Sequence, residues 1–266
     1  MDYNSFVNTI PSRLKESNCL RNAVDSILTQ TLPPQKVYIC VPQYYKRFDV
    51  VMDESLFPEW IAENPRVEII SGRDYGPATM YVYSYKIGGN MCAGNDDAIY
   101  DTGIIEKLAR FKSQNNLDAA GGWSYLWWND ESEIELDLNT PQLKVLTKYG
   151  NNEVDLDLTY LQSVDVILSD SSFYEGFGSF LDTCHSECPE SFLNDDIAHS
   201  YYLQYNKKKI DSIYKGDHGG DIYKEQKTAH VDSLSLDDSR IRDFNIKKYY
   251  NSYKIIDYLK ERFPII

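Results

Sequence analysis

The stretch Asn90-Met91-Cys92-Ala93-Gly94-Asn95-Asp96-Asp97 joins a short apolar run to an amide and two carboxylates. The apolar half predicts a buried strand, so the polar half lies at the end of that strand. Adjacent carboxylates at a strand end suit a hard divalent cation, which prefers oxygen ligands. The alternative is an N-cap for a following helix, a position that Asp also favours. Both interpretations stay open on these residues alone.

Outward from this stretch, short apolar runs alternate with helical spacings. Strands are predicted at 6–10, 36–41, 66–70, 90–94 and 119–125, and helices at 18–29 and 101–113. Such alternation with short connections implies a mostly parallel sheet covered by helices. Right-handed crossovers then give a Rossmann-like α/β layer, here in a single domain. In an open parallel sheet, ligands bind beyond the carboxyl ends of the strands.

Two further polar clusters follow predicted strands. Pro11-Ser12-Arg13 comes after the first strand, and Asp74-Tyr75-Gly76-Pro77 comes after the third. The Gly-Pro pair lets the backbone approach a ligand and then start a helix. The free amides of a helix N-terminus can bind an anion. The simpler interpretation of the second cluster is an ordinary turn from a loop into a helix.

The second half of the chain adds two more clusters. Asn194-Asp195-Asp196 opens a helix predicted at 195–205, and capping explains one of its two carboxylates. The other could accept a proton as a general base. Glu175-Gly176-Phe177 lies in a Gly-rich loop predicted within 164–180, after a strand and a turn. A Gly turn with an aromatic face and a carboxylate suits a sugar ring, although a tight turn explains it as well.

We expect one domain over residues 1–266, in three parts. A Rossmann-like nucleotide-binding part covers about 1–125, a second part with the later polar clusters about 126–240, and C-terminal helices about 241–266. The segment 130–161 is polar and acidic and predicts a β-ribbon or a long loop. The tail at 244–263 predicts one or two helices that pack on the domain.

Composition excludes several classes of protein. The 266 residues include 41 acidic and 27 basic ones, for a net charge of −14, which disfavours general nucleic-acid binding. Five cysteines without a dense pattern argue against a disulfide scaffold. No stretch reaches the roughly 20 apolar residues of a membrane span, and no signal pattern opens the chain. We expect a soluble, cytoplasmic protein.

Five clusters occur in one order: Thr9 to Arg13, Asp74 to Thr79, Asn95 to Tyr100, Glu175 to Gly178, and Asn194 to Ile197. This order resembles the GT-A glycosyltransferases, especially small family-2-like enzymes, including types carried by large DNA viruses. The resemblance covers about residues 5–210 and implies a GT-A fold. It also implies transfer of a sugar from a nucleotide diphosphate sugar, with UDP as the expected nucleotide, to a hydroxyl of a glycan or glycoprotein. If the protein is viral, we expect it in the cytoplasm of the host cell.

The resemblance also implies roles for single residues. Thr9, Pro11 and Arg13 would border the base and ribose. Asp74 would contact the base or ribose, and Gly76 and Pro77 would shape the wall. Asn95, Asp96 and Asp97 would form the equivalent of a DxD motif. In that motif Asp97 binds Mn²⁺ or Mg²⁺ and Asp96 contacts the ribose or the donor sugar.

The later clusters would supply the acceptor side. Glu175 and Gly176 would line the sugar and acceptor cleft. Asp195 and Asp196 would match the pair that contains the catalytic base, with Asp196 favoured as the second carboxylate. A base placed in this way implies inversion at the anomeric carbon. A late His often completes the metal shell in this fold, and His218 is the first candidate, with His230 second.

The sequence departs from the family pattern at two positions. Asn95 stands where relatives often have Asp, and Met80 stands where a Lys often follows. Both departures favour a non-catalytic nucleotide- or glycan-binding domain of the same fold as an alternative. A sugar nucleotidyltransferase is a further alternative, but Pro11-Ser12-Arg13 is not the Gly-rich loop that such enzymes usually have.

Overall fold

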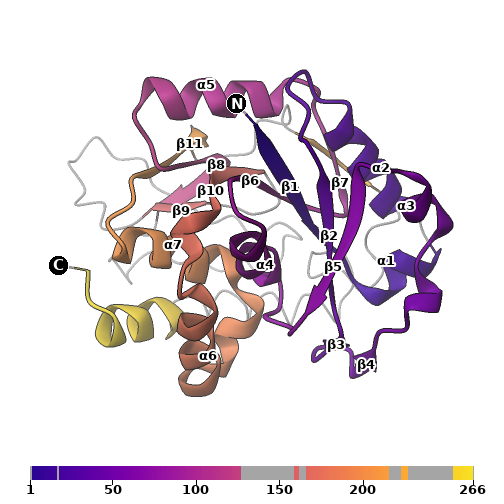
Figure 1. Ribbon diagram of the computed structural model, residues 1–266. Helices are drawn as coiled ribbons and strands as arrows, with labels where there is room; N and C mark the ends of the chain where they lie inside the picture. The colour runs from indigo at the N-terminus through magenta and orange to yellow at the C-terminus, as the bar shows by residue number, and fades with distance from the viewer. Residues whose placement is uncertain are drawn as a thin grey trace, which may run out of the picture.

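The computed structural model describes residues 2–16, 18–126, 159–161, 166–215, 223–226 and 254–265. Their central feature is an eight-stranded sheet with the order β11-β8-β10-β6-β1-β2-β5, and β9 pairs with β8 (Figure 1). The strands are β1 (Tyr3–Asn8), β2 (Val37–Pro42), β5 (Val67–Gly72), β6 (Asn90–Asn95), β8 (Ala119–Leu126), β9 (Thr159–Leu161), β10 (Ile167–Asp170) and β11 (Ile210–Lys215).

The sheet is mostly parallel, as the sequence predicts. The four neighbouring strands β6, β1, β2 and β5 run in one direction. β10 lies antiparallel between β6 and β8, and β11 is parallel to β8. The reversal at β10 divides the sheet into two parallel groups, and both groups contribute side chains to the hydrophobic clusters on the two faces of the sheet.

Two short strand pairs lie outside this sheet. One is the hairpin of β3 (Tyr44–Tyr45) and β4 (Val50–Val51). The other joins β7 (Ala98–Tyr100) to β12 (Tyr223–Glu225), which lies more than a hundred residues later. The second pair ties a late segment of the chain to the turn that follows β6.

Helices cover both faces of the sheet (Figure 1). One face packs against α1 (Pro11–Glu16), α2 (Cys19–Leu28), α3 (Glu59–Glu63) and α5 (Ile104–Gln114). The other packs against α4 (Thr79–Ile87), α6 (Phe177–Glu187), α7 (Asp195–Tyr205) and a helix at 254–262. Short 3₁₀ turns η1 (Glu54–Leu56), η4 (Ser171–Tyr174) and η5 (Pro189–Leu193) connect these elements.

The alternation of side chains along β2 explains the two-sided core. Val37, Ile39 and Val41 point into the cluster beneath α2 and α3, whereas Tyr38 and Cys40 point into the cluster beneath α4. All five side chains are buried, because a parallel strand covered on both faces is apolar at every position.

Most predicted elements are confirmed. The strands predicted at 36–41, 66–70, 90–94 and 119–125 are β2, β5, β6 and β8, and the helices predicted at 18–29, 101–113 and 195–205 are α2, α5 and α7. These segments have strong apolar periodicity, and their burial follows it. Ile104, Ile105 and Leu108 of α5 are buried, for example, while its other side carries exposed ion pairs.

Two predictions are wrong. The first strand ends at Asn8 rather than residue 10, and Pro11 begins α1 instead of only ending a strand. The fixed φ of proline suits the first position of a helix. The Gly-rich loop predicted up to residue 180 is the start of α6, which begins at Phe177 after Gly176 in the left-handed conformation (φ 78°).

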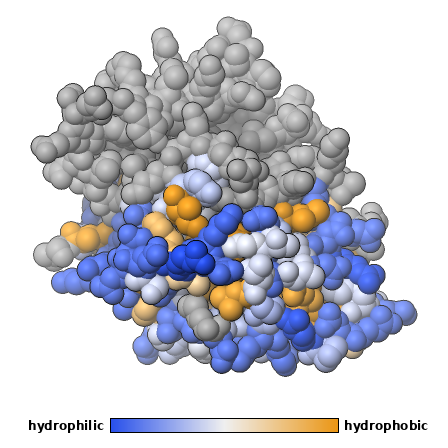
Figure 2. All heavy atoms as spheres, turned by 90° about the horizontal axis from the view of Figure 1, so that it is seen from above, coloured by the Kyte–Doolittle hydropathy of each residue, from blue (hydrophilic) through white to orange (hydrophobic). Residues whose placement is uncertain are grey.

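Several predictions fall outside the described residues. These are the ribbon or loop at 130–158, the start of the tail at 244–253, and the metal candidates His218 and His230. In the described parts of the chain, no helix is long and apolar enough to cross a membrane. Seen from above, the described surface is mostly hydrophilic, with small separate hydrophobic groups (Figure 2).

His199 of α7 is a buried polar residue in this core. Its side chain is inaccessible to solvent, and its Nε2 lies 2.8 Å from the Tyr174 hydroxyl. Its ring stacks on Tyr81 at 4.1 Å between centroids, with 12° between the planes. Burial disfavours the charged imidazole and lowers the pKa of His199 to about 3.

We expect His199 to make the folded protein less stable as the pH is lowered below about 6.5. Below about pH 6.5 the unfolded chain protonates His199, while the folded chain does not until about pH 3. Stability is therefore lost as pH falls through this window, by about 2 kcal/mol at pH 5. His199→Gln should flatten the melting temperature between pH 7 and pH 5. Tyr174→Phe, which keeps the imidazole buried, should retain the wild-type slope; an unchanged slope in His199→Gln would refute the assignment.

Candidate active site

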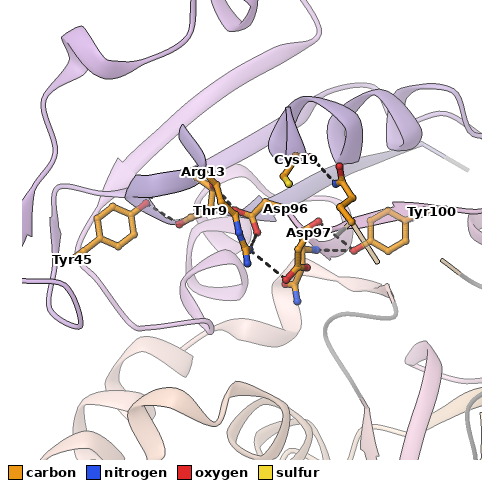
Figure 3. Close-up of polar contacts among 9 residues, drawn as sticks. Thr9, Arg13, Cys19, Tyr45, Asp96, Asp97 and Tyr100 are labelled. Atoms are coloured by element: carbon orange, nitrogen blue, oxygen red, sulfur yellow. Dashed lines mark hydrogen bonds and ion pairs between the residues drawn. The ribbon is translucent and has the colours of Figure 1, made fainter. Parts of the chain in front are cut away.

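The register of β1 and β6 brings the first and third polar clusters together. Asn8 pairs with Asn95 at the last position of both parallel strands. Thr9 and Asp96, which follow directly, therefore meet at the carboxyl edge of the sheet (Figure 3). Ligands of parallel sheets bind at this edge.

Asp96 is held by two donors. Its side chain is buried, the Thr9 hydroxyl donates to Oδ2 at 2.6 Å, and the Arg13 guanidinium donates to Oδ1. The net pKa of Asp96 is raised to about 6, because burial, together with the Asp97 charge, outweighs the lowering by Arg13 and Thr9. Both carboxylate oxygens of Asp96 therefore have partners within the protein.

Asp97 is placed differently. Its Oδ2 lies 3.3 Å from Nη1 of Arg13, and its side chain is 23% exposed. Among the residues that the structure describes, its buried Oδ1 has no hydrogen-bond partner. A carboxylate oxygen without a protein partner, on a side chain that is partly exposed, can serve as a ligand for a hard cation.

The capping interpretation of this stretch is wrong. Asp96 and Asp97 form the turn between β6 and β7, and no helix follows until α5 begins at Ile104. The Asn95 backbone N–H donates to the Tyr100 hydroxyl at 2.7 Å and closes the turn (Figure 3). The turn therefore presents its carboxylates in a loop between strands.

Gln226, which the sequence did not predict as a site residue, holds this turn through a hydrogen bond from a distant segment of the chain. Its backbone N–H donates to the Asp97 carbonyl at 3.1 Å. Its buried side chain accepts from Asn22 at 2.9 Å and donates to the Cys19 carbonyl at 2.9 Å. A lone Gln in a polar segment has no distinguishing pattern, so only the pairing of β12 with β7 reveals it.

The loop from Asp74 to Pro77 lies at the same edge, after β5. Asp74 is buried and accepts backbone N–H groups from Lys46 at 2.8 Å and Gly76 at 2.7 Å. Burial raises its pKa, while these two bonds lower it. The Asn8 side-chain amide donates to the Pro77 carbonyl, which ties the loop to the end of β1.

Gly76 brings this loop against the segment before α7. It is left-handed (φ +64°), and a Cβ there would collide with the Phe192 carbonyl in η5. Only glycine satisfies both conditions. The contact places the start of α7, two residues after η5, beside the Asp74 loop.

Asp195 and Asp196 both occupy the first turn of α7, and Asn194 takes the N-cap position without a side-chain cap bond. Asn194, rather than either acid, therefore occupies the N-cap position. Asp195 is buried, and both carboxylates, after burial itself, contribute to raising the pKa of Tyr81 in α4. Tyr100, at the end of β7, acts on the same phenol.

The turn at Glu175 and Gly176 lies on a different path. β10 is antiparallel to β6, so its last residue, Asp170, pairs with Asn90, the first residue of β6. Asn95 is the last residue of β6 and lies at the other end of that strand. From Asp170 the chain reaches the exposed Glu175, whose carbonyl accepts the Tyr202 hydroxyl. Within the described residues, these contacts do not join the turn to Asp96 or Asp97.

Pro11 and the predicted metal ligands are the remaining candidates for the site. Pro11 is the half-buried first residue of α1, and Arg13 is the third residue of the same helix. The described residues contain no group of three or more His, Cys, Asp or Glu that could hold a metal. A hard cation at Asp97 would therefore take most of its ligands from other oxygens, such as phosphates and water.

Comparisons with known proteins support the fold. No protein-family model matches the chain, and no curated protein matches it in sequence. A solved structure of TarS residues 1–349 from S. aureus, a GT-A-type glycosyltransferase, has a TM-score of 0.50 at 12% identity, over 96% of this chain and 72% of that one. A second TarS structure, in complex with UDP, has a TM-score of 0.47 at 13% identity, over 84% of this chain.

The chain spans 60% of the length of that second structure. At these identities the likeness shows the fold alone: a mostly parallel α/β sheet flanked by helices, as in GT-A glycosyltransferases. The resemblance to viral members of the family stays a prediction.

We expect the Arg13–Asp96 pair to dominate the stability of this site. Arg13→Met leaves a buried carboxylate without its cation and should cost about 3–5 kcal/mol of unfolding free energy. Arg110→Met removes an exposed pair with Glu106 and should change stability by less than about 0.5 kcal/mol. Urea denaturation of both variants measures the difference, and equal small losses would show that the buried pair is dispensable.

Proposed function

We propose that this chain is a glycosyltransferase that moves a sugar from a nucleotide diphosphate sugar to a hydroxyl acceptor. The observation that supports it most is Asp97, at the end of the central strand, with a buried oxygen that has no partner among the described residues. The GT-A-like fold agrees with this proposal. We propose a UDP-sugar as donor, from the sequence resemblance, and a glycan or glycoprotein as acceptor.

Local charge favours a divalent cation at this site. Asp96 and Asp97 place two carboxylates against one guanidinium, that of Arg13. A bound diphosphate would add negative charge to an edge that is already acidic. Mn²⁺ or Mg²⁺ at Asp97 Oδ1 would restore the balance, and when bound such an ion stabilises the charge of a departing diphosphate. Met80 supports the same view, since it is fully buried and contributes no cation.

A second protein ligand is proposed from the late part of the chain. Gln226 bonds the Asp97 carbonyl, and His218 and His230 lie eight positions before and four positions after Gln226 in the sequence. The sequence resemblance keeps His218 ahead of His230 as the candidate that completes the metal shell. Thr9, Pro11, Arg13 and Asn95 border the same edge and are proposed to contact the nucleotide, with Asp74, Gly76 and Pro77 as its wall.

The proposed reaction needs a base that removes the proton from the hydroxyl that receives the sugar. In the proposed step the acceptor hydroxyl oxygen bonds to the anomeric carbon, the bond to the diphosphate oxygen breaks, and Asp196 takes the hydroxyl proton. Attack from the face opposite the leaving group inverts that carbon. Asp195 is the alternative base, and Glu175 and Gly176 are proposed to border the acceptor path.

A non-catalytic nucleotide- or glycan-binding domain is the second candidate. Asn95 in place of an acid and the buried Met80 in place of a cation favour it. Slow release of UDP from a UDP-sugar in water separates the two, because a transferase hydrolyses its donor slowly and a binding domain does not. A thermal-shift screen of UDP, GDP, CDP and ADP with and without Mn²⁺ identifies the nucleotide.

We expect Asp97→Asn to weaken UDP binding in the presence of Mn²⁺ by at least about tenfold. The substitution keeps the side-chain shape and removes the anionic ligand. Calorimetry with and without Mn²⁺ measures it, and Asp101→Asn, at an exposed position nearby in sequence, serves as the control. Equal UDP affinity of wild type and Asp97→Asn would contradict the metal role.

We expect Asp196→Asn to keep UDP affinity within about twofold and to lower kcat by at least about a hundredfold, because only the proton acceptor is lost. Asp195→Asn, assayed in parallel, decides between the two acids. Loss of turnover in Asp195→Asn alone would move the base to that residue. Full turnover in both variants would remove the pair from the mechanism.

A further inference from the structure

The Tyr81 hydroxyl, on α4, is a buried polar group with no hydrogen-bond partner in the described part of the chain. Its side chain is inaccessible to solvent, and within the described residues its oxygen makes no hydrogen bond. Neighbouring tyrosines differ: the Tyr83 hydroxyl donates to the Arg73 carbonyl at 3.1 Å, and the Tyr174 hydroxyl bonds both Ser169 and His199. A buried hydroxyl that gains nothing is destabilising compared with phenylalanine, so its presence points to a use.

Ring contacts fix the direction of this hydroxyl. Tyr81 stacks on His199 at 4.1 Å, tilts against Tyr174 at 5.2 Å, and meets the edge of Phe177 at 6.2 Å. A ring packed on three sides cannot turn its hydroxyl toward a different partner without repacking the core. The Tyr81 hydroxyl can therefore bond only to groups that lie near its present position.

The carboxylates of α7 are prominent among those groups. His199, on which Tyr81 stacks, follows Asp195 by one helical turn, so both lie on the same side of α7. The charges of Asp195, Tyr174, Asp196 and Tyr100 act on the Tyr81 phenol, and the His199 ring stacks on it. Burial first, and then the Asp195 charge, raise the pKa of Tyr81 well above its usual value, so the hydroxyl stays protonated and can only serve these anions as a donor.

We propose that the Tyr81 hydroxyl donates a hydrogen bond to the Asp195 carboxylate through one bridging water, and so positions the Asp195–Asp196 pair. The inference rests on the proposed function, in which this pair supplies the proton acceptor. Tyr81 is a positioning residue, because it acts through Asp195 and does not touch the reacting atoms. The fixed charge of Asp195 beside Asp196 favours a proton moving onto the pair.

A double-mutant cycle tests the contact without any assumption about activity. Unfolding by urea is measured for wild type, Tyr81→Phe, Asp195→Asn and the double variant at pH 7. A contact between the two side chains gives a coupling of at least about fivefold in the unfolding equilibrium constant. Additive effects, within about twofold, would overturn the proposal, as would a gain of stability in Tyr81→Phe alone. Tyr83→Phe with Asp195→Asn is the matched control and should be additive.

Turnover then tests the consequence. Release of UDP from UDP-glucose and from UDP-N-acetylglucosamine should show a fall in kcat of at least about tenfold in Tyr81→Phe, with KM within about twofold. Tyr174→Phe, which loses a bonded hydroxyl, should lower stability more than kcat. Absence of turnover in wild type would refute the proposed function while the cycle still decides the contact. Normal kcat in Tyr81→Phe alongside active wild type would refute the positioning role.

Discussion

The site depends on the buried ion pair between Arg13 and Asp96. Charges inside a protein are costly unless each has a partner of opposite sign and satisfied hydrogen bonds. Arg13 and the Thr9 hydroxyl meet that condition for Asp96, from a helix and a strand end that lie 83 and 87 residues away in the sequence. The pair fixes α1 against the turn after β6. Asp97, the next residue, is thereby left at the edge with one oxygen unused by the described protein.

The reversal at β10 matters because it returns the chain to the face that α4 covers. After β10 the chain forms α6 and α7 on that face, and Tyr81 and His199 stack between α4 and α7. The contact of Gly76 with η5 brings the Asp74 loop to the same region. The two acids at the start of α7 therefore act on an aromatic core residue of α4, although no sequence pattern links the two helices.

Two kinds of negative charge thus serve different purposes in an acidic protein. Asp96 and Asp74 are buried and held by donors of the chain, so they organise loops. Asp97 and Asp196 are less buried and stay accessible to chemistry. Because the net charge of the chain is −14, an anionic ligand must be bound by local compensation rather than by general attraction. This division agrees with the nucleotide diphosphate ligand that we propose for this end of the sheet.

The sequence alone determined the elements with strong periodicity, such as β2, β6, α2 and α5, and it placed polar residues after the strands where a parallel sheet binds ligands. Those features follow from local spacing of apolar side chains. The tertiary structure alone decided that Arg13 pairs with Asp96, that Gln226 bonds Asp97, and that α6 begins at Phe177. Each of these depends on which strands become neighbours or on one glycine conformation. Neither is encoded in the periodicity of a single segment, so only the folded chain reveals them.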